Sequence, residues 1–494
     1  MRRFSLPATF LFLLAVVPAH AHVGSPDVFC EGNAGPYHLF VTIRVPQVIP
    51  GVAEIQVHTE SPDIRTVQVV PLRLTGPGSN FPPTPDLATS SKDDPQFFTA
   101  SLWLMEWGAL QVRILVDGPQ GKGELSVPVP SFAQRTMPMQ KSLGALLLVL
   151  MLVLSVGVIS IVGACVREGN LEPSEIPAPR NKRAAKWVMA ASAVAVLAIL
   201  YLARAWWGLE AQNFQRRVDF YKSPVAQATL VNGNRLVIRA KHENPRWYDY
   251  VKMEELLPDH DHLMHLFLIR SPGLDSMWHL HPDRMADGTF AEDLPAMPEG
   301  RYEIFADIVD KRGYPWTLVG SIDMPQINGK LTPGDDSSWS GAPLSASPGN
   351  STISQLSGGG RIVWQCASAP LKANVPLEFK FSVQEEHGNP AQDMQPYMGM
   401  AGHAEFVRSD FSVFAHLHPA GSVSMAALEL AQTGLPASSP MQAPMPMPMP
   451  AATVPISPEV RFPYGFPQPG DYRIFLQIKH SGRIDTGVFD ARVQ

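Results

Sequence analysis

Apolar and polar positions alternate over short runs in three separate regions of this chain. Such runs lie at 38–45 and 53–58, and further strand candidates lie at 263–269 and 302–308. Strict alternation is typical of strands with one buried face, and Pro and Gly separate the runs as turns would. The pattern predicts a mainly β chain, with immunoglobulin-like β-sandwich domains at 22–135, 218–326 and 360–494.

Two continuous apolar stretches interrupt this alternation. Residues 142–166 carry no charge, and 187–207 end in an aromatic and cationic belt around Trp206. A bilayer needs about 20 apolar residues, so both stretches are predicted to be transmembrane helices. The connection 167–186 is predicted to be cytoplasmic, because short loops rich in Lys and Arg stay inside.

The first 21 residues have the pattern of a secretory signal peptide. Arg2 and Arg3 precede an apolar run at 10–17, and Ala19-His20-Ala21 matches a cleavage site. Cleavage would leave His22 at the new N-terminus. Together with the two helices, this predicts a protein of the bacterial inner membrane with most of its chain in the periplasm.

Two low-complexity segments divide the last part of the chain. Residues 327–359 are rich in Gly, Ser, Pro and Asp, and are predicted to be a linker. Residues 436–458 contain alternating Met and Pro, which excludes a helix or a sheet interior and predicts an extended loop.

Charge and cysteine content exclude two classes of function. The net charge of −6 leaves no basic footprint, so nucleic acid is not an expected partner. The three cysteines form no CxxC motif, and no Cys accompanies the histidines described below. A blue-copper electron carrier needs a Cys ligand and is therefore not expected.

One histidine pattern occurs twice. A lone histidine is followed by a His-Leu-His-Pro sequence 14 residues later in the first copy and 13 later in the second. A similar phrase then closes each copy, Gly-Arg-Tyr-Glu-Ile-Phe at 300–305 and Gly-Asp-Tyr-Arg-Ile-Phe at 470–475. The histidines are His265, His279 and His281 in the first copy, and His403, His416 and His418 in the second.

Strand geometry predicts how these histidines meet. Residues i and i+2 share a face of a strand, so both histidines of each pair point one way and their apolar neighbours point into the core. A hairpin places His265 opposite His281 and His403 opposite His418, with opposed Cβ atoms about 5 Å apart. Each hairpin is therefore predicted to hold one metal ion on an exposed strand face, because imidazole is the commonest metal ligand.

Thioethers near the histidines favour copper as the metal, with another soft or borderline metal as the alternative. Met264, Met398 and Met400 lie close to the lone histidines in sequence, and Met selects Cu(I). His22 is a separate candidate ligand, which would need His38 or His58 as a partner. The sequence His260-Asp261-His262 reads as a solvated turn, with additional metal ligands as the alternative.

The histidine units resemble those of largely uncharacterised exported bacterial proteins with MHLF…HLHP and GMxGHA…FxHLHP patterns. More loosely, the chain is similar to periplasmic copper-binding β-sandwich proteins. The resemblance implies Ig-like domains and a role in copper storage, sensing or delivery. The sequence shows no signature of a known enzyme, so a non-catalytic protein is expected. The alternative function is an envelope scaffold that docks protein partners and uses its histidines structurally.

Overall fold

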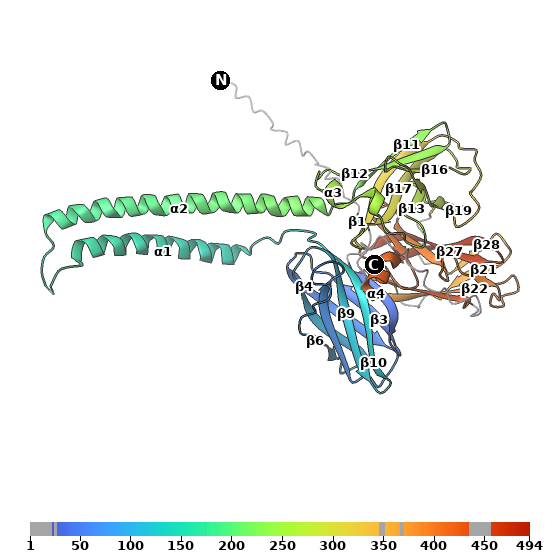
Figure 1. Cartoon of the computed structure of the whole chain (residues 1–494), viewed down its shortest axis with the longest axis horizontal. Helices are drawn as coiled ribbons and strands as arrows, with labels where there is room; N and C mark the ends of the chain where they lie inside the picture. The colour runs from blue at the N-terminus through green and yellow to red at the C-terminus, as the bar shows by residue number, and fades with distance from the viewer. Residues whose placement is uncertain (1–21, 24–26, 173, 345–350, 366–369, 434–455) are drawn as a thin grey trace, which may run out of the picture.

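A computed structural model describes residues 22–23, 27–172, 174–344, 351–365, 370–433 and 456–494. Three β domains lie together at one end of a long hairpin of two helices (Figure 1). The mainly β fold with two long apolar helices agrees with the prediction. The expected signal peptide, residues 1–21, and most of the Met-Pro insertion lie outside the described residues.

The first domain is a sandwich of two antiparallel sheets. One sheet has the order β2-β3-β4-β8-β7 and the other β10-β9-β5-β6. Buried and partly exposed residues alternate strictly along β3, so its apolar residues face the core between the sheets. The strands are β2 (Val28–Ala34), β3 (Tyr37–Arg44), β4 (Gly51–Thr59), β5 (Thr66–Arg73), β6 (Asp86–Leu87), β7 (Thr89–Ser90), β8 (Phe97–Leu104), β9 (Gly108–Gly118) and β10 (Gly121–Ser131).

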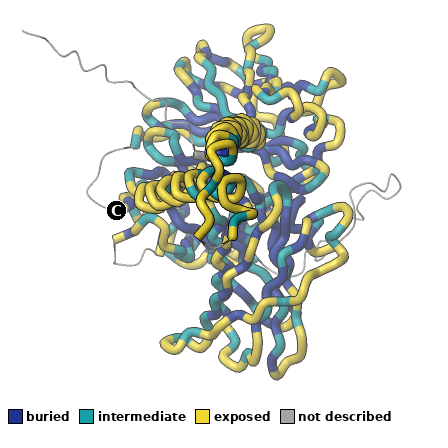
Figure 2. The backbone as a smooth tube through the Cα atoms, turned by 90° about the vertical axis from the view of Figure 1, so that its left-hand side faces the viewer, coloured by how far each residue is buried: buried dark blue, intermediate teal, exposed yellow. Residues whose placement is uncertain are grey.

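Both predicted membrane segments are helical. They lie in α1 (Lys141–Glu168) and α2 (Pro179–Phe220), which have the length and composition to cross a bilayer. The two helices run side by side and are largely exposed along their length (Figure 2). The connection is shorter than expected, 169–178, because the basic residues from Arg180 onward belong to the start of α2.

The end of α2 is fixed between the first two domains by aromatic packing. Phe214 of the helix contacts Trp107 of the first domain with ring centroids 5.6 Å apart. Tyr221, directly after the helix, stacks on Phe132 and on Trp316 of the second domain. The helix is therefore attached directly to the β domains rather than through a free linker.

The second domain is one curled sheet of nine strands in the order β15-β16-β12-β11-β18-β17-β13-β14-β19. Part of the expected linker belongs to it, because 337–340 form the edge strand β19. Its helical elements are α3 (Trp247–Tyr250) and η1 (Met253–Glu255). Its strands are β11 (Val225–Val231), β12 (Arg235–Lys241), β13 (His265–Ser271), β14 (Ser276–Leu280), β15 (Asp283–Arg284), β16 (Phe290–Asp293), β17 (Gly300–Val309), β18 (Pro315–Met324) and β19 (Ser337–Ser340).

The third domain packs two sheets against each other. One contains β1-β25-β24-β27-β23 with β28 paired to β27, and the other is β20-β21-β22-β26. A short helix, α4 (Met425–Thr433), follows the second histidine pair and was not expected from the sequence. The strands are β1 (His22–Val23), β20 (Ile353–Gln355), β21 (Arg361–Trp364), β22 (Leu377–Gln384), β23 (Met394–Gln395), β24 (His403–Arg408), β25 (Val413–Leu417), β26 (Glu459–Tyr464), β27 (Gly470–His480) and β28 (Arg483–Val493).

The repeated sequence unit is a repeated structural unit. In both copies a hairpin, β13–β14 or β24–β25, pairs on its other edge with the strand of the closing phrase, β17 or β27. The predicted hairpin registers are confirmed, since Leu266 pairs with Leu280 and Ala404 with Leu417. Each register brings the lone histidine level with the second histidine of its pair.

Candidate metal centre

The strand faces divide as alternation predicts. Leu266 and Leu268 point into the core of the second domain, together with Trp278 and Leu280 of the neighbouring strand. The histidines occupy the opposite face. That face is not exposed, as the sequence analysis expected, because the equivalent face of the third domain covers it. His279, for example, has no exposed surface.

Apolar contacts hold the two histidine faces together. Phe305 of the second domain stacks on Phe414 of the third, with ring centroids 4.2 Å apart and planes within 3°. Phe267 lies against the same ring at 5.1 Å. These side chains belong to a buried cluster drawn from both domains, so the contact between the domains has an apolar core beside the histidines.

Hydrogen bonds cross this contact reciprocally. His279 Nδ1 lies 2.8 Å from Gln477 Oε1 in the third domain. His416, which is equivalent to His279 in the repeat, has its Nδ1 3.3 Å from Asp307 Oδ2 in the second. Asp307 and Gln477 are themselves equivalent, because each pairs with the lone histidine of its own copy. The two repeats thus face each other with approximate two-fold symmetry.

The first group of possible ligands is the predicted one. His265, His279 and His281 each offer a ring nitrogen, and these atoms all lie within 4.8 Å of one another. Asp336 holds His281, accepting from its backbone N–H at 3.1 Å and lying 2.9 Å from its Nδ1. That contact leaves Nε2 of His281 directed toward the group. A carboxylate behind a ligating imidazole is the usual way to orient it toward a metal.

Two ring nitrogens of the first group lie at a spacing that suits a metal ion. Nδ1 of His265 lies 3.1 Å from Nε2 of His279, and two nitrogens bound to one ion at about 2.0–2.1 Å lie roughly 3 to 3.4 Å apart. Nε2 of His265 faces the carbonyl of Asp259 at 3.0 Å and can only donate to it. A neutral imidazole has one N–H, so Nδ1 of His265 keeps its lone pair for a metal ion.

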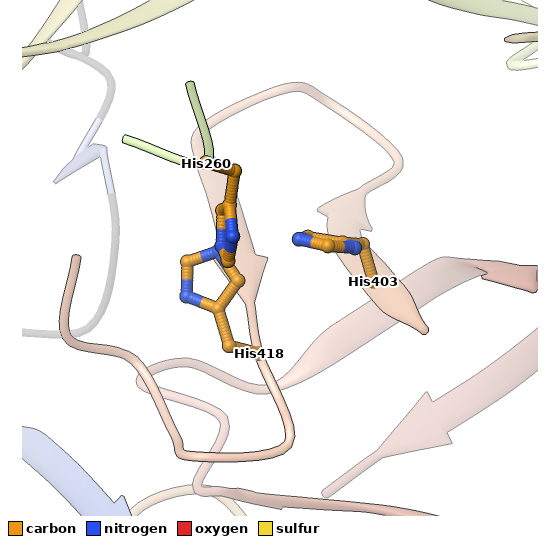
Figure 3. Close-up of side chains that lie close together, drawn as sticks. All are labelled: His260, His403 and His418. Atoms are coloured by element: carbon orange, nitrogen blue, oxygen red, sulfur yellow. The ribbon is translucent and has the colours of Figure 1, made fainter. Parts of the chain in front are cut away.

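The second group differs from the prediction and is shared by the two domains. It contains His403 and His418 of the third domain, but its third member is His260 of the second domain, not His416. Figure 3 shows the three rings converging, with one nitrogen of His403 turned toward the other two. His418 donates from Nδ1 to the carbonyl of Val423 at 3.1 Å, which leaves its Nε2 lone pair available.

A tight turn places His260. Asp259 and His262 exchange two backbone hydrogen bonds, of 2.8 and 3.0 Å, and both residues between them have positive φ, 50° and 68°. This is the geometry of a type I′ turn, which is unusual for residues other than Gly, Asn and Asp. The sequence alone therefore did not indicate that His260 lies in the centre and not in a solvated turn. The available clue was a third His-x-His spacing only three residues before His265.

The third domain repeats this turn at 397–400. Tyr397 and Met400 exchange backbone bonds of 2.8 and 3.1 Å, and Met398 has φ 48°. Met398 stands five residues before His403, as His260 stands five before His265. Met398 is thus the counterpart of His260 in the repeat, and the backbone of Met398 hydrogen-bonds to the His260 ring.

Many polar atoms of this centre are buried without a partner among the described residues. They include one ring nitrogen on each of four histidines, both nitrogens of His403 and both carboxyl oxygens of Glu405. A buried polar atom left unpaired costs about 1–3 kcal/mol, and folded proteins contain few of them. The four histidines are His260, His281, His416 and His418, each with Nε2 unpartnered.

Burial keeps these groups uncharged. It lowers the pKa of His265, His416 and His418 to about 3. Burial also lowers the pKa of the other four, His260, His279, His281 and His403, with neighbouring histidines adding to the effect. The neutral ring is the form that binds metals. Burial raises the pKa of Glu405 well above its ordinary value, so this carboxyl is protonated near neutral pH. Asp307, whose pKa burial raises to about 6, is largely ionised there and can offset the charge of a cation.

Three other predicted ligands have different surroundings. Met264 is buried in the apolar core of the second domain, on the opposite face of the chain from His265, so it is not part of either group. Met400 is half-buried at the end of the repeated turn. The backbone of His22 pairs with Val413 beside β25. His22 therefore lies in the sheet of the third domain, whereas His38 and His58 belong to the first.

Among known protein families, a match was found for one domain of this chain. A family profile described as a domain of unknown function (DUF8832) matches residues 358–494, which form the third domain. No curated protein matches the chain.

Similar solved structures include dimeric latent PorU from Porphyromonas gingivalis, at 8% identity over 95% of this chain and 34% of PorU, with a TM-score of 0.13. The ICAM-5 D1–D4 ectodomain fragment is 9% identical over 92% of this chain and 77% of the fragment, with a TM-score of 0.15. Escherichia coli alpha-2-macroglobulin activated by porcine elastase is 9% identical over 94% of this chain and 35% of its own, with a TM-score of 0.18. The chain spans about a third of the length of PorU.

Proposed function

We propose that this is a membrane-anchored, extracytoplasmic metal-binding protein, and that its metal is copper. The observation that carries the proposal is the pair of three-histidine groups buried between two domains, with donor nitrogens that lack partners among the described residues. Metal ions at these positions would pair those nitrogens.

The donor set favours copper over the commoner divalent metals. All six ligands are neutral imidazoles, which suit Cu, Zn, Ni and Fe, and Cu²⁺ binds most strongly of the first-row divalent ions. Storage, sensing and delivery are all compatible with a site that buries its ion.

The membrane setting rests on the two helices and the sequence signals. With the N-terminal segment exported, the connection 169–178 lies in the cytoplasm and the three β domains lie in the periplasm, anchored in the inner membrane. This arrangement places the histidine centre where exported copper-binding proteins act.

Metal analysis of the full-length protein in detergent tests the proposal. We expect about two copper ions per chain in the wild type. The variant His265→Ala/His279→Ala/His281→Ala should lose one ion, and His260→Ala/His403→Ala/His418→Ala should lose the other. A matched control, His38→Ala/His58→Ala/His387→Ala, removes three histidines outside both groups and should keep two.

Circular dichroism checks that each variant is folded. If a triple variant does not fold, the single variants His281→Gln and His418→Gln take its place. Wild-type protein that takes up no copper, nickel or zinc above the level of either variant contradicts the proposal. It would then favour the alternative, an envelope scaffold in which the histidines serve only to join the two domains.

A further inference from the structure

A cavity of about 220 Å³ opens onto the histidine centre where the three β domains and the end of α2 meet. His265, His416 and His418 form part of its wall, together with the carboxyl group of Asp307. The Nε2 atoms of His416 and His418 are buried and lack a partner within the described residues. The cavity therefore shares a wall with the centre, and these Nε2 atoms lie just beneath that wall.

Much of the remaining wall is aromatic. Tyr221 stacks on Trp316 with the planes within 7° and on Phe132 with the planes within 19°. Tyr314 packs against both Tyr221 and Trp316, at 5.2 and 4.7 Å between ring centroids. These four rings come from the first domain, the end of α2 and the second domain, so the aromatic wall forms only when the whole chain is assembled.

Size and lining together identify the kind of molecule that fits. An apolar cavity of about 150 Å³ holds one benzene molecule, so the present cavity accommodates a single ring with one or two substituents. Aromatic walls favour a flat ring by offset or edge-to-face contacts. The histidine wall favours a substituent that can ligate a metal ion, and a phenolic oxygen is such a group.

We propose that the cavity binds a water-soluble phenol or catechol whose hydroxyl oxygen completes the coordination of a metal ion held by the histidine centre. This inference rests on the proposed metal binding. A soluble molecule is favoured over a membrane lipid because 14 residues separate Tyr221 from the end of the apolar stretch at 207. At 1.5 Å per helical residue they place the cavity roughly 20 Å from the bilayer.

A spectroscopic titration tests the inference. Copper-loaded full-length protein in detergent is titrated with 4-nitrocatechol, whose absorption changes when its oxygens bind a metal. We expect saturation near one equivalent, co-elution of probe and copper with the protein in gel filtration, and loss of binding after the copper is removed.

Two half-buried alanines of the same packing cluster provide a matched pair of variants. Ala109 lines the cavity and Ala228 does not. Ala109→Phe should fill the cavity and weaken probe binding by about tenfold or more, with copper content unchanged. Ala228→Phe should bind like the wild type. If Ala109→Phe is unstable, Gln134→Phe fills the cavity from another lining position.

The outcomes separate the two proposals. Protein that takes up no copper contradicts the proposed function, and this inference fails with it. Normal copper content with no probe binding, or with equal binding by Ala109→Phe and Ala228→Phe, overturns the inference alone. A probe that elutes with copper but without the protein has merely extracted the metal, which also overturns it.

Discussion

Asp336 is the residue that fixes the orientation of one proposed ligand. It accepts from the backbone N–H of His281 and lies 2.9 Å from the ring Nδ1. Removing such a carboxylate typically weakens metal binding 10–100-fold, so Asp336→Asn should weaken the His265/His279/His281 site by about that factor. Isothermal titration with copper should show one of two binding events weakened and the other unchanged.

The neighbouring carboxylate provides the control for this variant. Asp335 lies 3.5 Å from His262, which belongs to neither histidine group. Asp335→Asn should therefore bind copper like the wild type. Equal affinities for Asp336→Asn and wild type would show that this carboxylate does not support a ligand.

Glu31, which belongs to neither histidine group, gives a pH-dependent prediction. Its side chain is 17% exposed, and burial followed by repulsion from Glu378 of the third domain raises its pKa to about 7. A carboxyl whose pKa is higher in the folded than in the unfolded protein stabilises the fold while it is protonated. This contribution is complete below the unfolded pKa, near 4.5, and is lost as the pH rises through the folded pKa of about 7. The titratable and charged groups that face it are His38, Glu60, Glu378, Lys380 and Arg461.

This rise in the pKa of Glu31 lowers the free energy of unfolding by at most about 3 kcal/mol between pH 4.5 and pH 8. Glu31→Gln should therefore melt at a higher temperature than wild type at pH 8 and near the wild-type temperature at pH 4.5. Glu124→Gln, which changes an exposed carboxylate of the same domain, should show no such difference between the two pH values. A Glu31→Gln variant with the same melting temperature as wild type at pH 8 would contradict the assignment.

What the sequence reveals about single residues depends on how local their contacts are. The members of each His-Leu-His pair share a face because the strand period fixes it, and their registers follow from short turns. His260 could not be assigned in this way, since its partners His403 and His418 belong to another domain. Met264 was wrongly predicted to be a ligand. Adjacent residues of an extended chain point to opposite faces, so Met264 points into the core of the second domain when His265 points into the centre.

At the scale of elements, periodicity predicted the strands and helices well, whereas composition was a poorer guide. The apolar stretches became α1 and α2, and the alternating runs became strands of the three domains. The Gly- and Ser-rich region around 337–340 nevertheless forms β19, because Ser337 and its neighbours complete the edge of the sheet beside β14. Hydrogen bonding to an existing strand edge outweighed the weak strand preference of these residues.

The hairpin of α1 and α2 leads to a prediction about membrane topology. A reporter inserted at Pro177, in the connection between the helices, should be active in the cytoplasm, and one at the C-terminus should be active in the periplasm. The physical reason is that two spans return the chain to the side from which it entered. A third fusion after Met137, before α1, should behave like the C-terminal one. The same compartment for all three fusions would rule out the hairpin.

At the scale of the whole molecule, the shared histidine group predicts that metal binding links two domains. An ion held by His260, His403 and His418 joins the turn at 259–262 to β24. A ligand at 100 times its Kd stabilises the bound state by about 2.7 kcal/mol. Copper should therefore slow amide exchange together in that turn and in β24, by about 100-fold, in hydrogen-exchange mass spectrometry.

The adjacent histidine serves as the control for this coupling. His262 lies in the same turn but belongs to neither group of possible ligands. His262→Ala should retain the joint protection, whereas His260→Ala should lose it in both segments. Protection by copper that is confined to one domain would show that the ion does not link them.

The reciprocal contact between the repeats also bears on ancestry. A single-repeat protein that paired with an identical copy would place His279 and Asp307 across its interface twice, as any symmetric dimer must. Once two such copies are fused in one gene, each side can change alone. This chain has Phe267 in one copy where the other has Glu405, and Asp307 where the other has Gln477. Two repeats within one chain are free of this self-complementarity, so the two halves of the centre can differ in chemistry.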